Sequence, residues 1–419
     1  MDKFVIHGPC KVRGQINVSG SKNAALPILA STLLFDELVE IKNLPDVKDV
    51  ETMINLLRSL NKKIKISKNK KIAKIYNSKK IKTFAPYSLV KTMRAGILCL
   101  GPLISKYKKA IVSMPGGCNL GSRPINLHLS SLGKMNMKYK IKKGYVHAKV
   151  NKNLIGNEIK FSKISVGATE NLIIASILAK GKTILKKCAI EPEVKDLVNF
   201  LNSAGAKIKW IGKRTLKIEG VNKLNSISYS VMGDRIETGT WCVLATLTAC
   251  KLKIKGLNPK LIQAELNALS KIGASIKSKD KEIEIYGKNK LRNINLITKE
   301  YPFFPTDMQA QFCVLLSKAN GRSTITENIF ENRFMHVAEL RRLGAKITIK
   351  GNKAIIEGNT KFEGAELMSS DLRASVALVL AAIVSNGKSV INRVYHQDRG
   401  MEKFENKLRS IGVDIKRVS

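Results

Sequence analysis

The segment from Pro115 to Pro124, with the sequence PGGCNLGSRP, combines residue types that can carry out chemistry. A cysteine, Cys118, follows two glycines, and an arginine, Arg123, comes five residues later. Glycines let the backbone approach a ligand closely, and the two prolines keep the segment out of a helix or a central strand. We therefore expect a loop that presents a thiol and a guanidinium to a bound molecule. For the Gly-Gly-Cys triplet alone, a surface turn with an incidental thiol is the alternative.

Polar residues and cations also gather where helices are expected to begin. These starts are Ser21-Lys22-Asn23, Ser165-Val166-Gly167, Asp234-Arg235, Thr306-Asp307 and Ser370-Asp371-Leu372-Arg373. Ser, Thr and Asp are ordinary N-caps, and capping alone accounts for many such residues. A cation opposes the helix dipole and gains nothing as a cap, so Lys22, Arg235 and Arg373 need another explanation. Helix N-termini attract anions, and the pattern therefore predicts an anionic ligand.

The elements that position these residues repeat along the chain. The phrase Leu-x-x-x-Gly-Ala-x-Ile, followed by a hairpin, begins at Leu201, Leu269 and Leu340. The matching anchor positions of all copies, 68 to 72 residues apart, are Asn61, Gly133, Gly205, Gly273, Gly344 and Gly412. A fixed period of this length indicates one supersecondary unit copied along the chain, here six times.

Each unit also contains a helix that is apolar nearly all round, which is typical of a buried helix. These helices are expected over residues 24–34, 90–104, 169–179, 238–249, 308–316 and 372–384. Strands such as Lys207–Trp210 alternate with period two, which indicates sheets with one solvated face. We therefore predict an α/β (α+β) fold, a two-domain inside-out α/β barrel with buried helices, sheets outside and three units per domain. The expected domains are residues 1–21 plus 233–419, and residues 22–232.

Composition limits the class of protein. The 419 residues carry a net charge of +42, which invites a nucleic-acid interpretation. The lysines accompany abundant Asn and Ile, as A·T-rich coding produces, and aromatic residues make up only 5%. We therefore expect no nucleic-acid partner. The longest apolar stretch, residues 375–384, is about half the length of a membrane span, so no membrane partner is expected either.

The seven cysteines form neither CxxC pairs nor a disulfide framework. Such usage, without a signal-peptide pattern at the start, predicts a reduced, cytoplasmic protein. Apart from Cys118, the cysteines lie in helices, strands or apolar runs, so we expect those six to be buried and slow to react. No His, Cys or Asp spacing indicates a metal site, and we expect none.

The loop from Pro115 to Pro124, the motif Gly20-Ser21-Lys22-Asn23 and the string FPTDMQAQF around Asp307 resemble those of the enolpyruvyl transferases, in particular of the enzymes that use UDP-N-acetylglucosamine. The resemblance covers essentially the whole chain. It implies transfer of the enolpyruvyl group from phosphoenolpyruvate to the 3′-hydroxyl of UDP-N-acetylglucosamine, with release of phosphate. This is the first committed step of peptidoglycan synthesis, and it implies no metal or other cofactor.

The resemblance also implies roles for individual residues. Cys118 would act as general acid and carry a pyruvate or phospholactoyl thioether-type adduct, and fosfomycin alkylates this position in the family. Asp307 would act as the base. The expected phosphoenolpyruvate contacts are Lys22, Asn23, Arg123, Arg373 and Arg399. The expected UDP-N-acetylglucosamine contacts are Arg94, Arg123, Pro124, Ile125, Asn126, Leu127, Lys163, Ile164, Ser165, Val166, Asp307 and Ile329.

Two alternatives stay open. The sister enzyme that uses shikimate 3-phosphate shares the fold and phosphoenolpyruvate, but it typically lacks the cysteine loop. A basic nucleic-acid-binding scaffold belongs to a different class and would bind with an affinity that falls steeply with salt.

Overall fold

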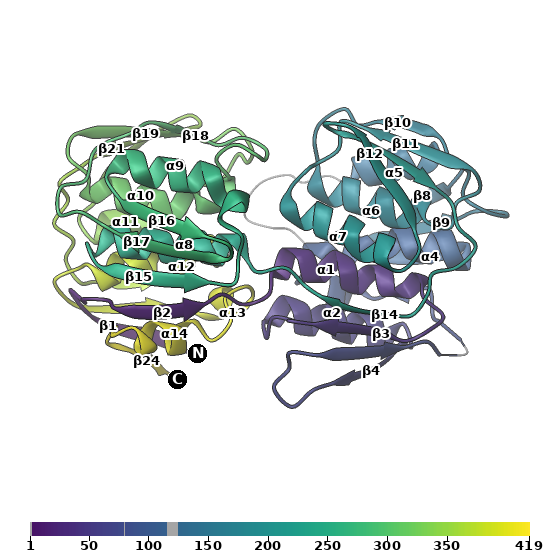
Figure 1. The fold of residues 1–419 in the computed structure, drawn as a ribbon, viewed down its shortest axis with the longest axis horizontal. Coiled ribbons are helices and arrows are strands. Elements are labelled where there is room, and N and C mark those ends of the chain that lie inside the picture. Colours follow the sequence, from purple (N-terminus) through teal and green to yellow (C-terminus); the bar gives the residue numbers. More distant parts are fainter. Residues whose placement is uncertain (1, 79, 115–124) are drawn as a thin grey trace. The chain divides into compact units, whose positions relative to one another are not determined.

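The computed structural model describes residues 2–78, 80–114 and 125–419. These residues form two compact units, drawn in Figure 1. Unit 1 comprises the described residues up to Ser19 and from Gly233 to Ser419, and unit 2 comprises those from Gly20 to Met232. In the described ranges, no helix is long and apolar enough to cross a membrane.

Unit 2 contains three four-stranded sheets with one shared topology. Its strands are β3 (Val39–Lys42), β4 (Lys63–Ile66), β5 (Ala73–Tyr76), β6 (Phe84–Ala85), β7 (Lys109–Ser113), β8 (Lys138–Lys142), β9 (Tyr145–Lys149), β10 (Glu158–Lys160), β11 (Lys182–Lys186), β12 (Lys207–Gly212), β13 (Thr215–Glu219) and β14 (Ile227–Ser230). The sheet orders are β14-β3-β5-β4, β6-β7-β9-β8 and β10-β11-β13-β12. In each sheet the first two strands are parallel, and an antiparallel hairpin completes it.

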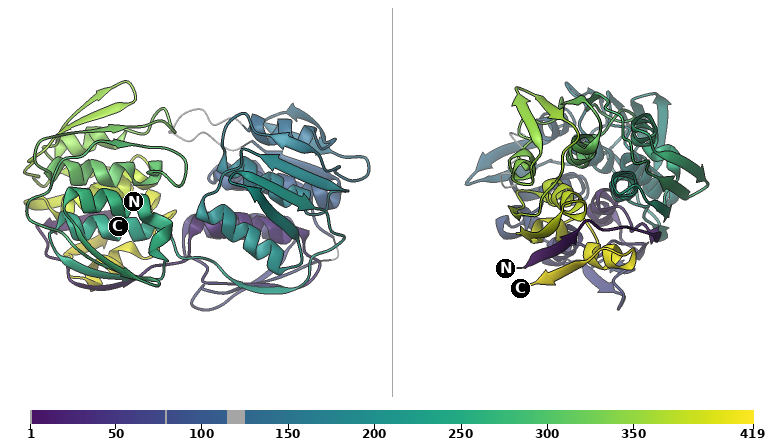
Figure 2. Two further views of the ribbon diagram at one scale, coloured as in Figure 1. Left: turned by 45° about the horizontal axis from the view of Figure 1, so that its top comes forward. Right: turned by 90° about the vertical axis from the view of Figure 1, so that its left-hand side faces the viewer.

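Unit 1 contains three further four-stranded sheets. Its strands are β1 (Lys3–Gly8), β2 (Gly14–Asn17), β15 (Lys251–Lys255), β16 (Ser275–Lys279), β17 (Glu282–Tyr286), β18 (Leu296–Ile297), β19 (Arg322–Thr326), β20 (Lys346–Lys350), β21 (Lys353–Glu357), β22 (Glu366–Met368), β23 (Gly387–Asn392) and β24 (Ile415–Val418). The sheet orders are β2-β15-β17-β16, β18-β19-β21-β20 and β22-β23-β1-β24. In the last sheet β1 pairs with both β23 and β24, so the two ends of the chain lie side by side (Figure 2).

Helices fill the interior of each unit. The α-helices are α1 (Lys22–Ser31), α2 (Lys48–Ser59), α3 (Tyr87–Val90), α4 (Leu100–Tyr107), α5 (Asn126–Gly133), α6 (Val166–Ser176), α7 (Pro192–Ser203), α8 (Arg235–Leu247), α9 (Gln263–Ile272), α10 (Gln309–Lys318), α11 (His336–Arg342), α12 (Leu372–Ile383), α13 (Tyr395–Asp398) and α14 (Phe404–Ser410). The 3₁₀ helices are η1 (Thr32–Leu34), η2 (Arg94–Cys99), η3 (Pro259–Ile262) and η4 (Thr306–Met308). Every residue of α8 is buried, and α1, α6, α10 and α12 are buried over most of their length. The predicted arrangement of buried helices with sheets outside is therefore confirmed.

The helix predicted over residues 90–104 is wrong in detail, because the segment is divided into α3, the 3₁₀ helix η2 and α4. The side chain of Asn171, from α6, bonds to two backbone groups that an unbroken helix would join to each other. Its Oδ1 accepts the Gly101 amide N–H at 2.8 Å, and its Nδ2 donates to the Ile97 carbonyl at 3.2 Å. A Cβ at Gly101 would lie 2.3 Å from Asn171 Oδ1, so only glycine fits at this position.

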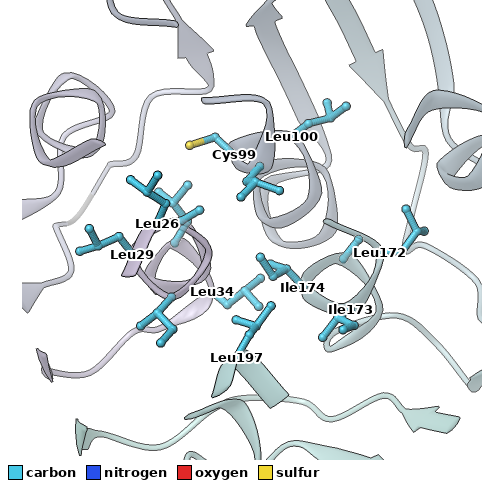
Figure 3. Packing of buried hydrophobic residues seen from close by; sticks show 14 of the residues in the cluster. Leu26, Leu29, Leu34, Cys99, Leu100, Leu172, Ile173, Ile174 and Leu197 are labelled. Atoms are coloured by element: carbon cyan, nitrogen blue, oxygen red, sulfur yellow. The ribbon is translucent and has the colours of Figure 1, made fainter. Parts of the chain in front are cut away.

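The core of unit 2 is built from leucine and isoleucine side chains of these helices. Figure 3 shows Leu26 and Leu29 of α1 near Ile174 of α6 and Leu197 of α7. All four side chains are buried, and burying such a side chain fully contributes about 1.5–3 kcal/mol relative to its exposed state.

The chain following α1, the end of α4 and the chain following α6 line one cavity of about 270 Å³, at Leu34, Ser105 and Leu178. The C-terminal ends of these three helices therefore lie near one another. Lysine ammonium groups satisfy the carbonyls at the C-terminal end, where cations suit the helix dipole. Lys106 Nζ donates to the Leu34 carbonyl at 2.9 Å, and Lys108 Nζ donates to the Ser105 carbonyl at 2.6 Å.

Candidate functional site

The first cation of the site lies at the start of α1. Ser21 Oγ caps this helix by accepting the Ala24 amide N–H at 3.3 Å. The next residue, Lys22, donates from Nζ to Asp49 Oδ2 at 2.9 Å, and both side chains are nearly buried. Because α2 supplies the carboxylate, the ammonium group is held at a helix N-terminus that would otherwise repel it. Asn23, also expected at the site, is the second residue of α1.

The start of α6 offers backbone donors. Ser165 caps the helix through the Ala168 amide, at 3.3 Å. The amides of Val166 and Gly167 belong to the first turn and have no intrahelical acceptor. The expected contacts Lys163 to Val166 are exposed or half-buried, so a ligand can reach them.

A buried histidine lies against this helix start. His128, in α5, has its ring beside Gly167, and its Nδ1 lies 2.9 Å from Asn171 Nδ2. Burial and the nearby charge of Arg94 lower the pKa of His128 to about 4, so the ring is neutral near pH 7. With Asn171 donating to Nδ1, the ring proton is on Nε2. His128 is thus a neutral donor beside the free amides of α6.

The remaining expected residues of unit 2 fall at nearby helix starts. Arg94 opens η2, Ile125 precedes α5, and Asn126 and Leu127 are its first two residues. Cys118, Arg123 and Pro124 lie outside the described residues.

In unit 1, two guanidinium groups hold one carboxylate. Asp307 Oδ1 accepts from Arg333 Nη2 at 2.6 Å, and Oδ2 accepts from Arg373 Nη2 at 2.9 Å. The two arginine side chains are less than 10% exposed, whereas the Asp307 side chain is 26% exposed. The carboxylate therefore remains open to a ligand on one side.

The starts of α8, η4–α10 and α12 meet around this carboxylate. Asp307 lies in η4, Arg373 is the second residue of α12, and Arg235 is the first residue of α8. Burial alone would raise the pKa of Asp307, but the charges of Arg373, Arg333 and Arg235 outweigh it and hold that pKa well below its usual range. Asp307 is thus ionised, and weakly basic, in the free protein.

Capping contacts fix this arrangement. Asp371 Oδ1 accepts the amide N–H groups of Arg373 at 2.8 Å and Ala374 at 3.1 Å, which positions the first turn of α12. Glu327 Oε2 accepts from the Thr306 hydroxyl at 2.8 Å, and its Oε1 accepts the Ile329 amide N–H at 2.8 Å. The loop that carries Ile329 is therefore tied to the residue before Asp307.

Comparison with known proteins agrees with this architecture. The sequence model of the EPSP synthase (3-phosphoshikimate 1-carboxyvinyltransferase) family matches residues 6–408. The UDP-N-acetylglucosamine 1-carboxyvinyltransferase of Pelagibacter ubique is 61% identical over 419 residues, which covers all of both chains. The enzyme of the same name from Idiomarina loihiensis is 47% identical over 420 residues, again across all of both chains. The chain belongs to the enolpyruvyl transferase family.

Solved structures show the same fold at low sequence identity. The enolpyruvyl transferase NikO from Streptomyces tendae has a TM-score of 0.90 and 22% identity, covering 100% of this chain and 99% of that one. The EPSP synthase of Acinetobacter baumannii has a TM-score of 0.79 and 18% identity, covering all of both chains.

Within this enolpyruvyl transferase, the expected residues fall into two groups, one in each unit, and most of them lie at helix starts. Asp307 and Arg373 are in direct contact in unit 1. Ile329 is half-buried in the loop anchored by Glu327, and the half-buried Arg399 follows α13. In the parts of the chain that the structure describes, no group of three His, Cys, Asp or Glu side chains could hold a metal ion.

Sequence reasoning missed several residues that position the site of this enolpyruvyl transferase. Asp49 holds Lys22, Glu327 anchors the loop of Ile329, and His128 lies beside Gly167. Of these three residues, only His128 could have been found from the sequence. It lies four residues after Pro124, in a short segment rich in candidate site residues. Asp49 resembles an ordinary acidic residue in the first turn of a helix.

Proposed function

We propose that the protein transfers the enolpyruvyl group of phosphoenolpyruvate to the 3′-hydroxyl of UDP-N-acetylglucosamine and releases phosphate, the first committed step of peptidoglycan synthesis. The identity of 61% with a relative named for this activity, across the full length of both chains, carries the proposal. The cations and free amides at the helix starts support it, because both substrates are anionic.

In this proposal, unit 2 binds the nucleotide sugar. The free amides of Val166 and Gly167 and the charges of Lys163 and Arg94 suit a diphosphate, because helix N-termini are ready-made anion sites. The segment from Arg123 to Leu127 is assigned to the same nucleotide sugar. Lys22, Asn23, Arg123 and Arg399 bind phosphoenolpyruvate, and Arg373 binds its carboxylate, a group that an arginine fork matches bidentately.

The reaction is addition followed by elimination. The 3′-oxygen bonds to C2 of phosphoenolpyruvate as Asp307 takes the hydroxyl proton, and Cys118 delivers a proton to C3. The C2–O bond to phosphate then breaks while C3 returns a proton to the Cys118 thiolate, so the enol ether forms, phosphate leaves, and the proton on Asp307 passes to phosphate or water. General acid–base groups of this kind typically contribute about 10²- to 10⁴-fold in rate.

Because Asp307 is paired with Arg373, binding of phosphoenolpyruvate also changes the pKa of Asp307. Arg373 donates one Nη2 hydrogen bond to Asp307, and its other N–H groups can serve a substrate carboxylate. The negative charge of bound phosphoenolpyruvate then offsets that of Arg373 and raises the pKa of Asp307, because a nearby positive charge favours the ionised carboxylate. The base becomes more basic only when the electrophile is bound.

The proposed partners are these two small molecules, and the proposed location is the cytoplasm. Among the described residues, Cys10, Cys99, Cys188, Cys242, Cys250 and Cys313 are free thiols, as is typical of a reducing compartment.

Phosphate release tests the proposal directly. The protein is incubated with phosphoenolpyruvate and either UDP-N-acetylglucosamine or shikimate 3-phosphate. We expect release only with the nucleotide sugar. Release only with shikimate 3-phosphate would instead support the activity named in the matched family description.

A further inference from the structure

The positive charge of the chain is concentrated in one stretch. Residues 52–157 contain 24 of the 74 lysines and arginines and none of the 32 acidic residues. The other 313 residues carry 50 basic and 32 acidic residues. A uniform compositional bias would spread the excess along the chain, so the local excess needs a local explanation.

Much of this stretch folds into the sheet β6-β7-β9-β8. Lys109, Lys149 and Lys138 are direct neighbours across three of its strands, and Lys140 lies opposite His147. Neighbouring strands are about 4.8 Å apart, so the three aligned side chains stand close together. We call the exposed side chains of Lys109, Lys138, Lys140, Lys142 and Lys149 the lysine face. Among the described residues, none of these five lysines forms an ion pair with an acidic side chain.

Four other sheets pair some of their basic residues internally. In each of them a glutamate on one strand pairs with a basic residue on the neighbouring strand. These pairs are Glu40 with Lys74, Glu158 with Lys186, Glu284 with Lys253, and Glu357 with Arg322. The lysine face has no acid of its own, so its positive charge is available to an anionic partner.

Exposed apolar side chains accompany the lysine face. Phe84, 47% exposed, stacks on Tyr145 with ring centroids 5.4 Å apart, and the strand register places both rings on the same side of the sheet as the lysine face. Tyr139 and Ile141 alternate with the lysines along β8 and therefore project from the other side of this exposed edge strand. Lysines beside exposed aromatic side chains are the composition that binds at a lipid–water interface.

We propose that the lysine face and the edge strand β8 bind the surface of an anionic lipid bilayer. β8 and β9 run along the outside of unit 2, where a flat partner can reach them (Figure 1). Single-stranded nucleic acid is bound by stacking of bases on aromatic rings in a groove, whereas the Phe84 and Tyr145 rings stack on each other. A peripheral contact of this kind needs no membrane-spanning helix.

Vesicle co-sedimentation tests the proposal with the full chain. The vesicles contain phosphatidylcholine alone or with about 30% phosphatidylglycerol, an anionic lipid that attracts lysines. We expect binding only to the anionic vesicles, weakening as salt increases. Each lysine near an anionic surface contributes about fivefold in affinity, so K138Q/K140Q/K142Q should bind about 100-fold more weakly.

The matched control is K277Q/K279Q/K281Q. It removes the same charge from and beside β16, the edge strand of another sheet, where Lys277 and Lys279 lie opposite Glu284 and Glu282. We expect this control to bind vesicles nearly as well as the unchanged protein, and both variants to keep their melting temperature and phosphate release. F84S, which removes an exposed ring on the side of the lysine face, should also weaken vesicle binding.

Equal losses in the two triple variants would overturn the proposal, since net charge alone would then explain binding. Failure to bind anionic vesicles, or equal binding to neutral vesicles, would also overturn it. Binding to poly(U) RNA without binding to vesicles would assign the lysine face to nucleic acid instead. None of these outcomes depends on whether the protein transfers enolpyruvyl groups.

Discussion

Arg373 Nη2 lies 2.9 Å from Asp307 Oδ2, although 66 residues separate the two in the sequence. The proposed base is therefore paired, before any substrate binds, with a guanidinium that also suits an anionic substrate. The pair keeps the pKa of Asp307 well below its usual range in the free protein. If bound phosphoenolpyruvate offsets the charge of Arg373, the pKa of Asp307 rises, and substrate binding is linked to activation of the base.

Asp307→Asn should keep substrate binding and reduce turnover. The amide oxygen can still accept a hydrogen bond from one of the two arginines, but the amide cannot take the proton of the 3′-hydroxyl. We expect a loss of about 10²- to 10⁴-fold in phosphate release. Calorimetric titration with UDP-N-acetylglucosamine is the control for binding. Near-normal turnover would reduce Asp307 to a structural residue.

Arg333→Gln should change the pH dependence. Arg333 lowers the pKa of Asp307, so its removal raises that pKa. As pH falls, kcat/KM should therefore decline at a higher pH than in the unchanged protein. Arg341→Gln, an exposed position in α11, is the control and should leave the profile unchanged. If kcat/KM of Arg333→Gln declined at the same pH as that of the unchanged protein, the assignment of Asp307 as the base would be contradicted.

Arg399→Lys should weaken binding of phosphoenolpyruvate more than binding of the nucleotide sugar. A lysine keeps the charge but loses the planar fork, and a hydrogen bond to a charged group corresponds to about 10- to 100-fold in affinity. Titration of each ligand into the variant measures both effects. If both affinities fell equally, a general structural role for Arg399 would be the better explanation.

Fosfomycin should label Cys118 alone among the seven cysteines. Burial raises the pKa of Cys99 and Cys188 to about 12, and Cys242 and Cys313 are also buried. Peptide mapping should show faster labelling with UDP-N-acetylglucosamine and slower labelling with phosphoenolpyruvate. Cys118→Asp should escape the label and keep turnover, because a carboxylic acid also delivers a proton, whereas Cys118→Ala should lose turnover.

A label on Cys10 or Cys188 would contradict this assignment, as would labelling indifferent to both ligands. Cys10 is the more serious competitor, because it and Cys250 are partly exposed. The expectation that all six other cysteines are buried was therefore wrong for these two. Burial nevertheless raises the pKa of the Cys10 thiol, which makes it a poorer nucleophile.

Gly358→Ala should destabilise unit 1. A Cβ at this position would lie 1.7 Å from the carbonyl oxygen of Ala319, so the backbone would have to move. We expect a loss of at least about 1–3 kcal/mol, measured by urea unfolding. Gly133→Ala is the control, because nothing lies within 4 Å of its Cβ position. Equal stability of both variants would mean that the close approach at Gly358 relaxes without cost.

The repeated elements were predictable because each copy meets the same steric demand. The phrase that predicted the hairpins ends at Gly220, Gly287 and Gly358. At each of these glycines a Cβ would come within 2.3 Å of a carbonyl oxygen at the end of a buried helix. A constraint that recurs at a fixed spacing leaves a visible pattern in a single sequence.

The pairings at the site were not predictable in this way. Asp307 is bound by Arg333 and Arg373, and Lys22 by Asp49, through contacts that each occur once in the fold. The division of the helix predicted over residues 90–104 likewise depends on one side chain, Asn171, from a distant helix. Periodicity identifies which faces are buried, but it does not identify which charged residues meet.

The pairing of β1 with β23 and β24 affects how the chain is made. Unit 2 is continuous from Gly20 to Met232, so all its strand partners exist once Met232 has been synthesised. β1 must wait for the 187 residues from Gly233 to Ser419, which take about 10–40 s at typical rates of synthesis. β2 gains its partner β15 soon after Met232, but β1 has no partner strand until β23 and β24 are made, so the first residues to leave the ribosome are among the last to find their place.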